Sequence, residues 1–318
     1  MPRPASSSSS SPRRRGRVLR ILAACAVLLA VAGYVVAQML ATGTTGPARC
    51  TVRAAAEGDG EAPSYELQPV QASNAATIAA VGASRGLRDR AVTIALATAM
   101  QESSLRNISY GDRDSIGLFQ QRPSQGWGTK KQIMDPIYST GKFYEHLVEV
   151  PGYSRLPLTV AAQRVQRSGF PQAYAKHERN AALLTAALTG RNAASLHCTT
   201  GPGGGDGKAG RADRVQAQLV REFGEKSAPS NTAGPGRKGG SAGGARVSES
   251  ALTLPATSVR RGWELAHWAM SHSARLRVSE IVYRGHVWSA DRSEDGWRKD
   301  DGEKRGSRSV LLRLATAD

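Results

Sequence analysis

Apolar residues recur at helical spacing over several segments of the chain, and they predict a helical core. The stretch 88–103 is apolar on nearly every side from Ala91 to Met100, which is typical of a helix in the middle of a core. The stretch 69–84 predicts a neighbouring helix that stops at Gly86. Further helices are predicted at 136–149, 157–167 and 171–188.

The final third of the chain has a different pattern. Helices are predicted at 211–223 and 259–276 from their amphipathic spacing. Alternating apolar positions predict a strand, a turn and a second strand over 279–289, and a last strand at 309–314. This mixture of elements predicts a small α+β domain.

Near the N-terminus, Ile21 to Leu40 is a run of 20 residues without a charge, and six Arg precede it. A helix of this length spans a bilayer core of about 30 Å. The positive-inside rule then places the N-terminus in the cytoplasm and 41–318 outside the plasma membrane. A cleaved signal peptide, a lipobox at Cys25 and a twin-arginine signal at Arg14 and Arg15 each fit this segment less well than an uncleaved anchor does.

Composition divides the chain into six predicted segments. Stretches rich in Gly, Ser, Pro or Ala bury little apolar surface and therefore mark tethers and linkers. The segments are a disordered basic cytoplasmic tail at 1–17, a transmembrane helix at 18–40, a tether at 41–65, a helical domain at 66–198, a Gly-rich linker at 199–210, and an α+β domain at 211–318 with a Gly/Ser-rich insert at 226–246.

The net charge of +17 does not indicate a nucleic-acid partner, because no basic stripe is interleaved with aromatic residues. A basic exterior suits an anionic cell-envelope polymer. The three Cys and six His show no metal-ligand spacing, so no metal or cofactor is predicted. Cys50 and Cys198 flank the helical domain and are predicted to form a disulfide in an oxidising compartment, the alternative being two buried thiols.

Glu102 ends the predicted buried helix. The C-terminus of a helix and apolar surroundings both favour a protonated carboxyl, so Glu102 is a candidate general acid. The alternative is an ordinary helix-end Glu exposed to water. Two motifs accompany Glu102: Glu102-Ser103-Ser104, and fifteen residues after Glu102 the run Gly117-Leu118-Phe119-Gln120 with Pro123.

This pattern resembles the soluble lytic transglycosylases and goose-type lysozymes, over residues 70–190. Their motif is Glu-Ser followed at the same spacing by Gly-Leu-Met-Gln-x-x-Pro, and Phe119 stands where Met is usual. The resemblance implies a mainly α lysozyme-like domain and cleavage of the β-1,4 bond between N-acetylmuramic acid and N-acetylglucosamine in peptidoglycan. It also implies that Glu102 is the acid/base, and that the substrate-binding residues are Ser103, Gly117 and Gln120.

A third motif of that family, Ala-Tyr-Asn-x-Gly, is altered here. The corresponding stretch 161–168 is AAQRVQRS, which lacks the usual Tyr. Gln163 and Gln166 are candidates to replace its hydrogen bond, and Tyr110 and Tyr174 are candidates to reach the site from elsewhere. The support for Glu102 therefore stays open at the level of sequence.

Asp112 and Asp114 are candidates for the second carboxylate of a lysozyme-type mechanism. The alternative is that both Asp residues cap backbone amides in a turn. Trp127 is a candidate for stacking on a sugar ring, or else a packed anchor of its loop. His146 and His177 have no metal spacing and are interpreted as structural.

Residues 259–298 resemble the C-terminal half of a secreted domain related to zinc D-Ala-D-Ala carboxypeptidases, but the zinc-ligand positions are not occupied by suitable residues. Such a degenerate domain would bind stem peptides, act as a spacer or bind another protein. Two functions stay open for the whole chain: a membrane-anchored enzyme that cleaves peptidoglycan glycan strands, and a weakly active or non-catalytic wall-binding scaffold. The two functions differ in whether Glu102 is required.

Overall fold

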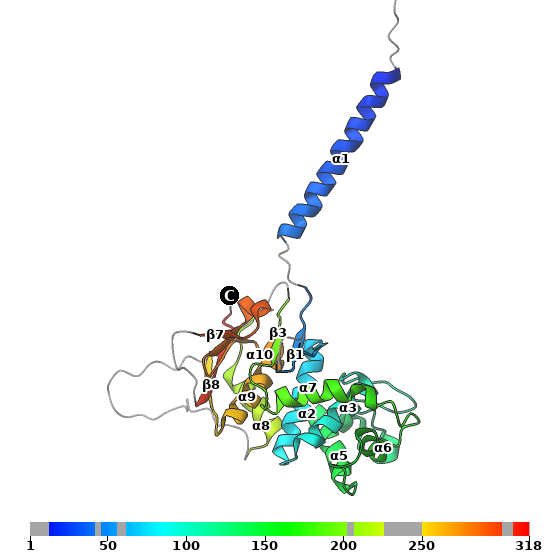
Figure 1. Ribbon diagram of the computed structural model, residues 1–318, viewed down its shortest axis with the longest axis vertical. Helices are drawn as coiled ribbons and strands as arrows, with labels where there is room; N and C mark the ends of the chain where they lie inside the picture. The colour runs from blue at the N-terminus through cyan, green and yellow to red at the C-terminus, as the bar shows by residue number, and fades with distance from the viewer. Residues whose placement is uncertain are drawn as a thin grey trace, which may run out of the picture. The chain divides into compact units, whose positions relative to one another are not determined.

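The computed structural model describes residues 13–41, 46–55, 62–201, 207–225, 250–300 and 308–317. Residues 1–46 form one unit, in which the described element is the helix α1 (Arg13–Ala41), and residues 47–318 form a second compact unit (Figure 1). The predicted insert at 226–246 lies outside the described residues, as does most of the predicted tail at 1–17.

The membrane prediction is corrected by the structure. Within the described part of the chain, no helix combines the length and apolar character that are needed to cross a bilayer. The predicted transmembrane helix at 18–40 is therefore wrong, and so are the fold class that began with it and the plasma-membrane localisation. A span needs about 20 consecutive apolar residues, and the side chains that the structure describes in α1 run without a break only from Ile21 to Tyr34.

The predicted helices of the second unit are present. Helix α3 lies in the middle of the core, and every residue from Ala91 to Met100 is buried, as its sequence predicts. The helix predicted at 171–188 begins only at Glu178, after a turn and a short 3₁₀ segment. The elements are α2 (Pro69–Ser84), α3 (Asp89–Ser103), η1 (Pro123–Gln125), α4 (Lys130–Ile133), α5 (Pro136–Glu149), α6 (Leu158–Gln166), η2 (Ala175–His177) and α7 (Glu178–Leu188).

Three short antiparallel strands accompany these helices. Strand β1 (Cys50–Arg53) pairs with both β2 (Ser64–Leu67) and β3 (Leu196–Cys198). Cys50 lies directly opposite Cys198 and forms a disulfide with it, which confirms the predicted pairing. The stretch predicted as a tether at 41–65 thus supplies β1 and the first residues of β2. The other partner of β1, strand β3, lies far along the chain, so no local pattern indicates that pairing.

The last third of the chain forms a five-stranded antiparallel sheet in the order β4-β8-β5-β6-β7. Helix α9 packs against one face of this sheet, at β5 and β8. Since side chains alternate along a strand, Val310 and Leu312 of β8 are buried toward α9 while Leu311 and Arg313 lie on the other face. The elements are α8 (Ala212–Phe223), β4 (Ala251–Pro255), α9 (Val259–Ser271), α10 (Ser273–Leu276), β5 (Val278–Tyr283), β6 (His286–Ser289), η3 (Ala290–Asp295), β7 (Arg298–Lys299) and β8 (Ser309–Leu314).

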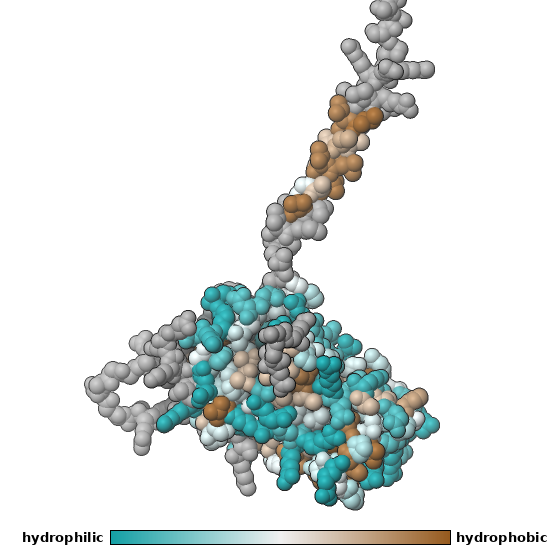
Figure 2. Space-filling model, viewed as in Figure 1, coloured by the Kyte–Doolittle hydropathy of each residue, from teal (hydrophilic) through white to brown (hydrophobic). Residues whose placement is uncertain are grey.

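Polar side chains join the sheet and its helices to the first group of helices. Trp288 Nε1 donates to the carbonyl of Cys198 at 3.0 Å. The fully buried carboxylate of Glu222 on α8 accepts from Thr77 of α2 and from Trp268 of α9. The α+β region therefore packs directly on α2 and α7 within one compact unit. The visible face of residues 47–318 is largely hydrophilic, with scattered apolar patches (Figure 2).

Candidate active site

Glu102 lies in the last turn of α3, which ends at Ser103 and is followed by Ser104 in a left-handed conformation. Its side chain is half-buried, and the hydroxyl of Tyr174 donates to Glu102 Oε1 at 2.7 Å. Burial raises the pKa of Glu102, and hydrogen bonds from Tyr174 and Gln166 lower it by a smaller amount. The carboxyl therefore holds its proton to higher pH than an ordinary Glu does.

A side-chain hydrogen bond to Glu102 comes from Tyr174. The altered third motif has no tyrosine that could make this bond. The side chain of Tyr174 is fully buried, and burial together with the charge of Glu102 raises its pKa far above the usual value. Tyr174 thus remains a hydrogen-bond donor at every relevant pH. Tyr110, the other candidate, is 72% exposed and contributes its backbone carbonyl to Gln120 rather than contacting Glu102.

The two glutamines of α6 have different roles. Gln166 lines the cavity beside Glu102, and its Nε2 donates to the carbonyl of Phe119 at 2.8 Å. Gln163 instead donates to the carbonyl of Ser168 at 2.7 Å and is not among the residues that line this cavity. Of the two candidates, Gln166 is therefore the one placed to stabilise the Glu102 carboxylate.

Ser103 and Gly117 shape the loop after α3. Ser103 Oγ donates to the carbonyl of Leu118 at 2.8 Å, which joins α3 to the second motif. Gly117 has a φ of +80°, and a Cβ there would lie 2.9 Å from the carbonyl of Ile133, so only glycine fits. Neither residue lines the cavity, whereas Gln120 does.

The cavity beside Glu102 has a volume of about 810 Å³. Its walls come from the end of α3, the long loop before α4, the end of α5, and the end of α6 with the turn that follows. Its lining includes Glu102, Asp112, Arg113, Gln120, Arg122, Trp127, Glu149, Arg164, Gln166, Arg167 and Phe170.

The two candidate second carboxylates differ in their surroundings. Asp114 accepts from Arg122 Nε at 2.7 Å and from the backbone and side chain of Ser124, and these contacts hold its pKa well below the usual range. Asp114 does not line the cavity, and its contacts are those of a turn residue. Asp112 does line it, but its side chain is 93% exposed and lies 3.9 Å from Arg113.

Phe170 and four arginines in the wall of this cavity carry no signal in the sequence that marks them for this site. Phe170 lines the cavity with 76% of its surface exposed, an unusual state for a large apolar side chain. Trp127, a candidate sugar platform or loop anchor, is partly buried with its ring 4.4 Å from that of His146. Four arginines also line the walls: Arg113, Arg122, Arg164 and Arg167. Only tertiary structure brings these residues to one surface.

Comparison with known proteins gives one result. Residues 204–309 match a family described as VldE, C-terminal domain, which covers about a third of the chain. The match includes α8, α9 and most of the five-stranded sheet, and Glu102 lies outside it. No curated protein matches the chain. These findings describe the C-terminal region and do not address the Glu102 cavity.

Proposed function

We propose that this chain cleaves the glycan strand of peptidoglycan, with Glu102 first as general acid and then as base. The observation that carries the proposal is the half-buried Glu102, which has a raised pKa and a Tyr174 hydrogen bond and lines a cavity of about 810 Å³. The likeness of its two motifs to lytic transglycosylases adds independent support.

In this mechanism the protonated Glu102 donates its proton to the glycosidic oxygen as the bond to the sugar carbon breaks. The sugar then carries an oxocarbenium-like charge. Tyr174 and Gln166 stabilise the carboxylate that remains, because their hydrogen bonds favour its ionised form. The carboxylate next removes a proton from the group that attacks the sugar carbon, either the muramyl 6-hydroxyl or a water molecule.

The surroundings of Glu102 favour attack by the 6-hydroxyl. Among the described residues that line the cavity, the other carboxylates are Asp112 and Glu149. Asp112 is almost fully exposed and Glu149 is 75% exposed, so that neither is held in a defined position by packing. A route that needs only Glu102 gives a 1,6-anhydro product, and we expect this product rather than a reducing end.

The second candidate function is a wall-binding protein without activity. The altered third motif favours it in the sequence, because the supporting tyrosine is missing there. Tyr174 makes an equivalent contact from the η2 region, so the missing motif tyrosine does not leave Glu102 without support. The cleaving function is therefore the better supported of the two.

The test uses the full chain with its disulfide intact, beside Glu102→Gln and, as a matched control, Glu149→Gln. Each protein is incubated with purified peptidoglycan, and the soluble products are identified by mass spectrometry. We expect anhydro-muropeptides from the wild type and Glu149→Gln, and at least about 100-fold less from Glu102→Gln, since loss of a general acid costs that much. Equal release by Glu102→Gln, or wall binding by all three proteins without release, would refute the proposal.

A further inference from the structure

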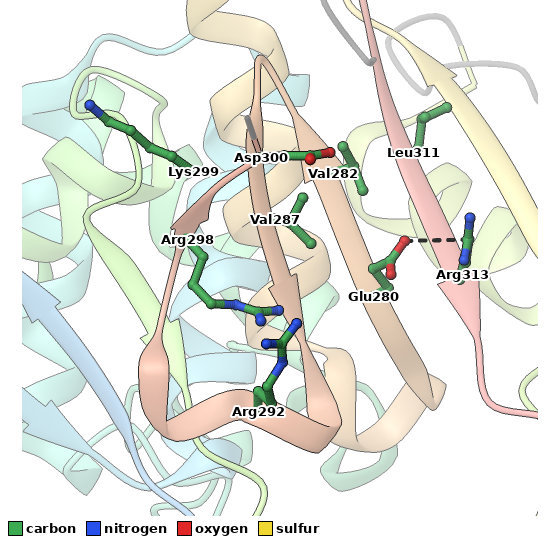
Figure 3. A pocket seen from close by; sticks show the side chains of 9 residues that line it. All are labelled: Glu280, Val282, Val287, Arg292, Arg298, Lys299, Asp300, Leu311 and Arg313. Carbon is green, nitrogen blue, oxygen red and sulfur yellow. Dashed lines mark ion pairs between the residues drawn. The ribbon is translucent and has the colours of Figure 1, made fainter. Parts of the chain in front are cut away.

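A second cavity lies on the face of the five-stranded sheet that points away from α9 (Figure 3). Tyr283 of β5 contacts Trp263 of α9, so the alternating Glu280 and Val282 lie on the opposite face. The cavity has a volume of about 480 Å³ and shares no lining residue with the cavity beside Glu102. It is therefore a separate candidate site.

The floor of this cavity is aliphatic and its rim is charged. Val282 of β5, Val287 of β6 and Leu311 of β8 form the floor. The charged lining residues are Arg292, Arg298, Lys299, Arg313, Glu280 and Asp300, which gives the described lining a net formal charge of +2. A cavity with this lining attracts an anion that carries an apolar group.

The basic residues do not all have acidic partners on the rim. Arg313 Nε pairs with Glu280 at 3.3 Å (dashed line in Figure 3). Arg292 of η3 and Arg298 of β7 instead point toward one another at the other end of the cavity (Figure 3). Two guanidinium charges in this arrangement repel each other unless an anion lies between them.

Within the described part of the chain, neither Arg298 nor Arg292 forms an ion pair with an acidic side chain that lines the cavity. Arg298 Nη2 donates to the neutral Ser289 Oγ at 2.8 Å, and its Nε is buried without a hydrogen-bond partner in the described part of the chain. The charge of Arg292 helps to lower the pKa of Asp291, its neighbour in the chain, and Asp291 does not line the cavity. The cavity itself thus presents two guanidinium groups toward a ligand.

We propose that this cavity binds a small ligand in which a carboxylate is attached to a short aliphatic group. The carboxylate lies between Arg292 and Arg298, since planar guanidinium groups bind carboxylates through paired hydrogen bonds. The aliphatic group covers Val282, Val287 and Leu311. Inorganic phosphate shares the oxyanion chemistry but cannot use the aliphatic floor.

The test is a titration of the full chain, with labelled Val and Leu methyl groups, followed by NMR. The probes are N-acetyl-alanine, acetate and inorganic phosphate. We expect N-acetyl-alanine to shift the methyl signals of Val282, Val287 and Leu311 and to bind more tightly than acetate or phosphate. The variant Arg292→Gln should weaken this binding about tenfold, because it removes charge-assisted hydrogen bonds.

The matched control is Arg284→Gln, which removes the same charge from an exposed turn between β5 and β6 outside the cavity. It should change the affinity less than about twofold, since an exposed charge away from the cavity acts only weakly. Glu102→Gln should bind N-acetyl-alanine as the wild type does, so this proposal and the proposed function fail separately. Unchanged methyl signals, equal weakening by Arg284→Gln and Arg292→Gln, or phosphate binding as tight as that of N-acetyl-alanine would each overturn the proposal.

Discussion

Glu222 offers the sharpest test of how the α+β region is held to the helices. Its carboxylate is fully buried and accepts hydrogen bonds from Thr77 at 3.0 Å, Trp268 at 2.7 Å and His272 at 3.2 Å. Burial alone would raise its pKa. The charge of His272 and the hydrogen bonds outweigh burial, and they lower the pKa from the usual 4.5 to about 2.

The lowered pKa makes the stability of the protein depend on pH. Because the folded-state pKa lies below the unfolded value, the carboxylate stabilises the fold at neutral pH, and this contribution is lost as the pH falls from about 4.5 toward 2. A shift of this size corresponds to about 3 kcal/mol. Glu222→Gln should therefore lower the free energy of unfolding by about 2–4 kcal/mol at pH 7, since it also leaves His272 without its carboxylate partner.

The assay is urea denaturation of the full chain at several pH values between 3 and 7. The wild type should lose stability in acid more steeply than Glu222→Gln does, since the variant has no carboxylate to titrate there. Glu225→Gln is the matched control, because it removes a charge from an exposed position three residues further on. Equal acid sensitivity in the wild type and Glu222→Gln would refute this account of Glu222.

Two further predictions concern the candidate active site and the disulfide. Tyr174→Phe should lower the rate of muropeptide release about tenfold and move the alkaline limb of its pH profile to higher pH, because the variant lacks a hydrogen bond that lowers the pKa of Glu102; Tyr110→Phe is the control, and an unmoved limb would contradict the assignment. Replacing Cys50 and Cys198 together by Ser should lower the free energy of unfolding by about 3–5 kcal/mol, since their disulfide closes a loop of 148 residues. In the same denaturation assay Cys25→Ser should have no such effect, because Cys25 is free and exposed.

Local sequence patterns are sufficient to predict most of the helices. The positions of α2, α5 and α8 follow from apolar spacing and from start and stop signals that act within a few residues. The late start of α7 has no such signal, because 171–177 forms a turn and a 3₁₀ segment, which local propensity does not distinguish from a first helical turn. The predicted membrane helix at 18–40 is wrong, because no helix in the described part of the chain is long and apolar enough to cross a bilayer.

The residues of the candidate site also differ in whether the sequence alone identifies them. Glu102 is identifiable from the sequence because its helix is apolar on nearly every side and its motifs lie at a familiar spacing. Its supporting residues are not, and the sequence offers only alternatives for them. Which of Gln163 and Gln166 lies beside Glu102 depends on the rotation of α6 against α3, and that rotation is set by packing.

The sequence by itself determined the helical core and the position of Glu102 at the end of α3, since both depend on residue type and order along the chain. For Cys50 and Cys198 it left two buried thiols as an alternative to the disulfide that the structure shows. Tertiary structure alone decided that Tyr174 contacts Glu102 and that Arg292 and Arg298 share a cavity. Tyr174 lies 72 residues from Glu102, and long-range contacts of this kind depend on how the elements pack. Local spacing has no information about such packing, because the same short pattern fits many arrangements of neighbouring elements.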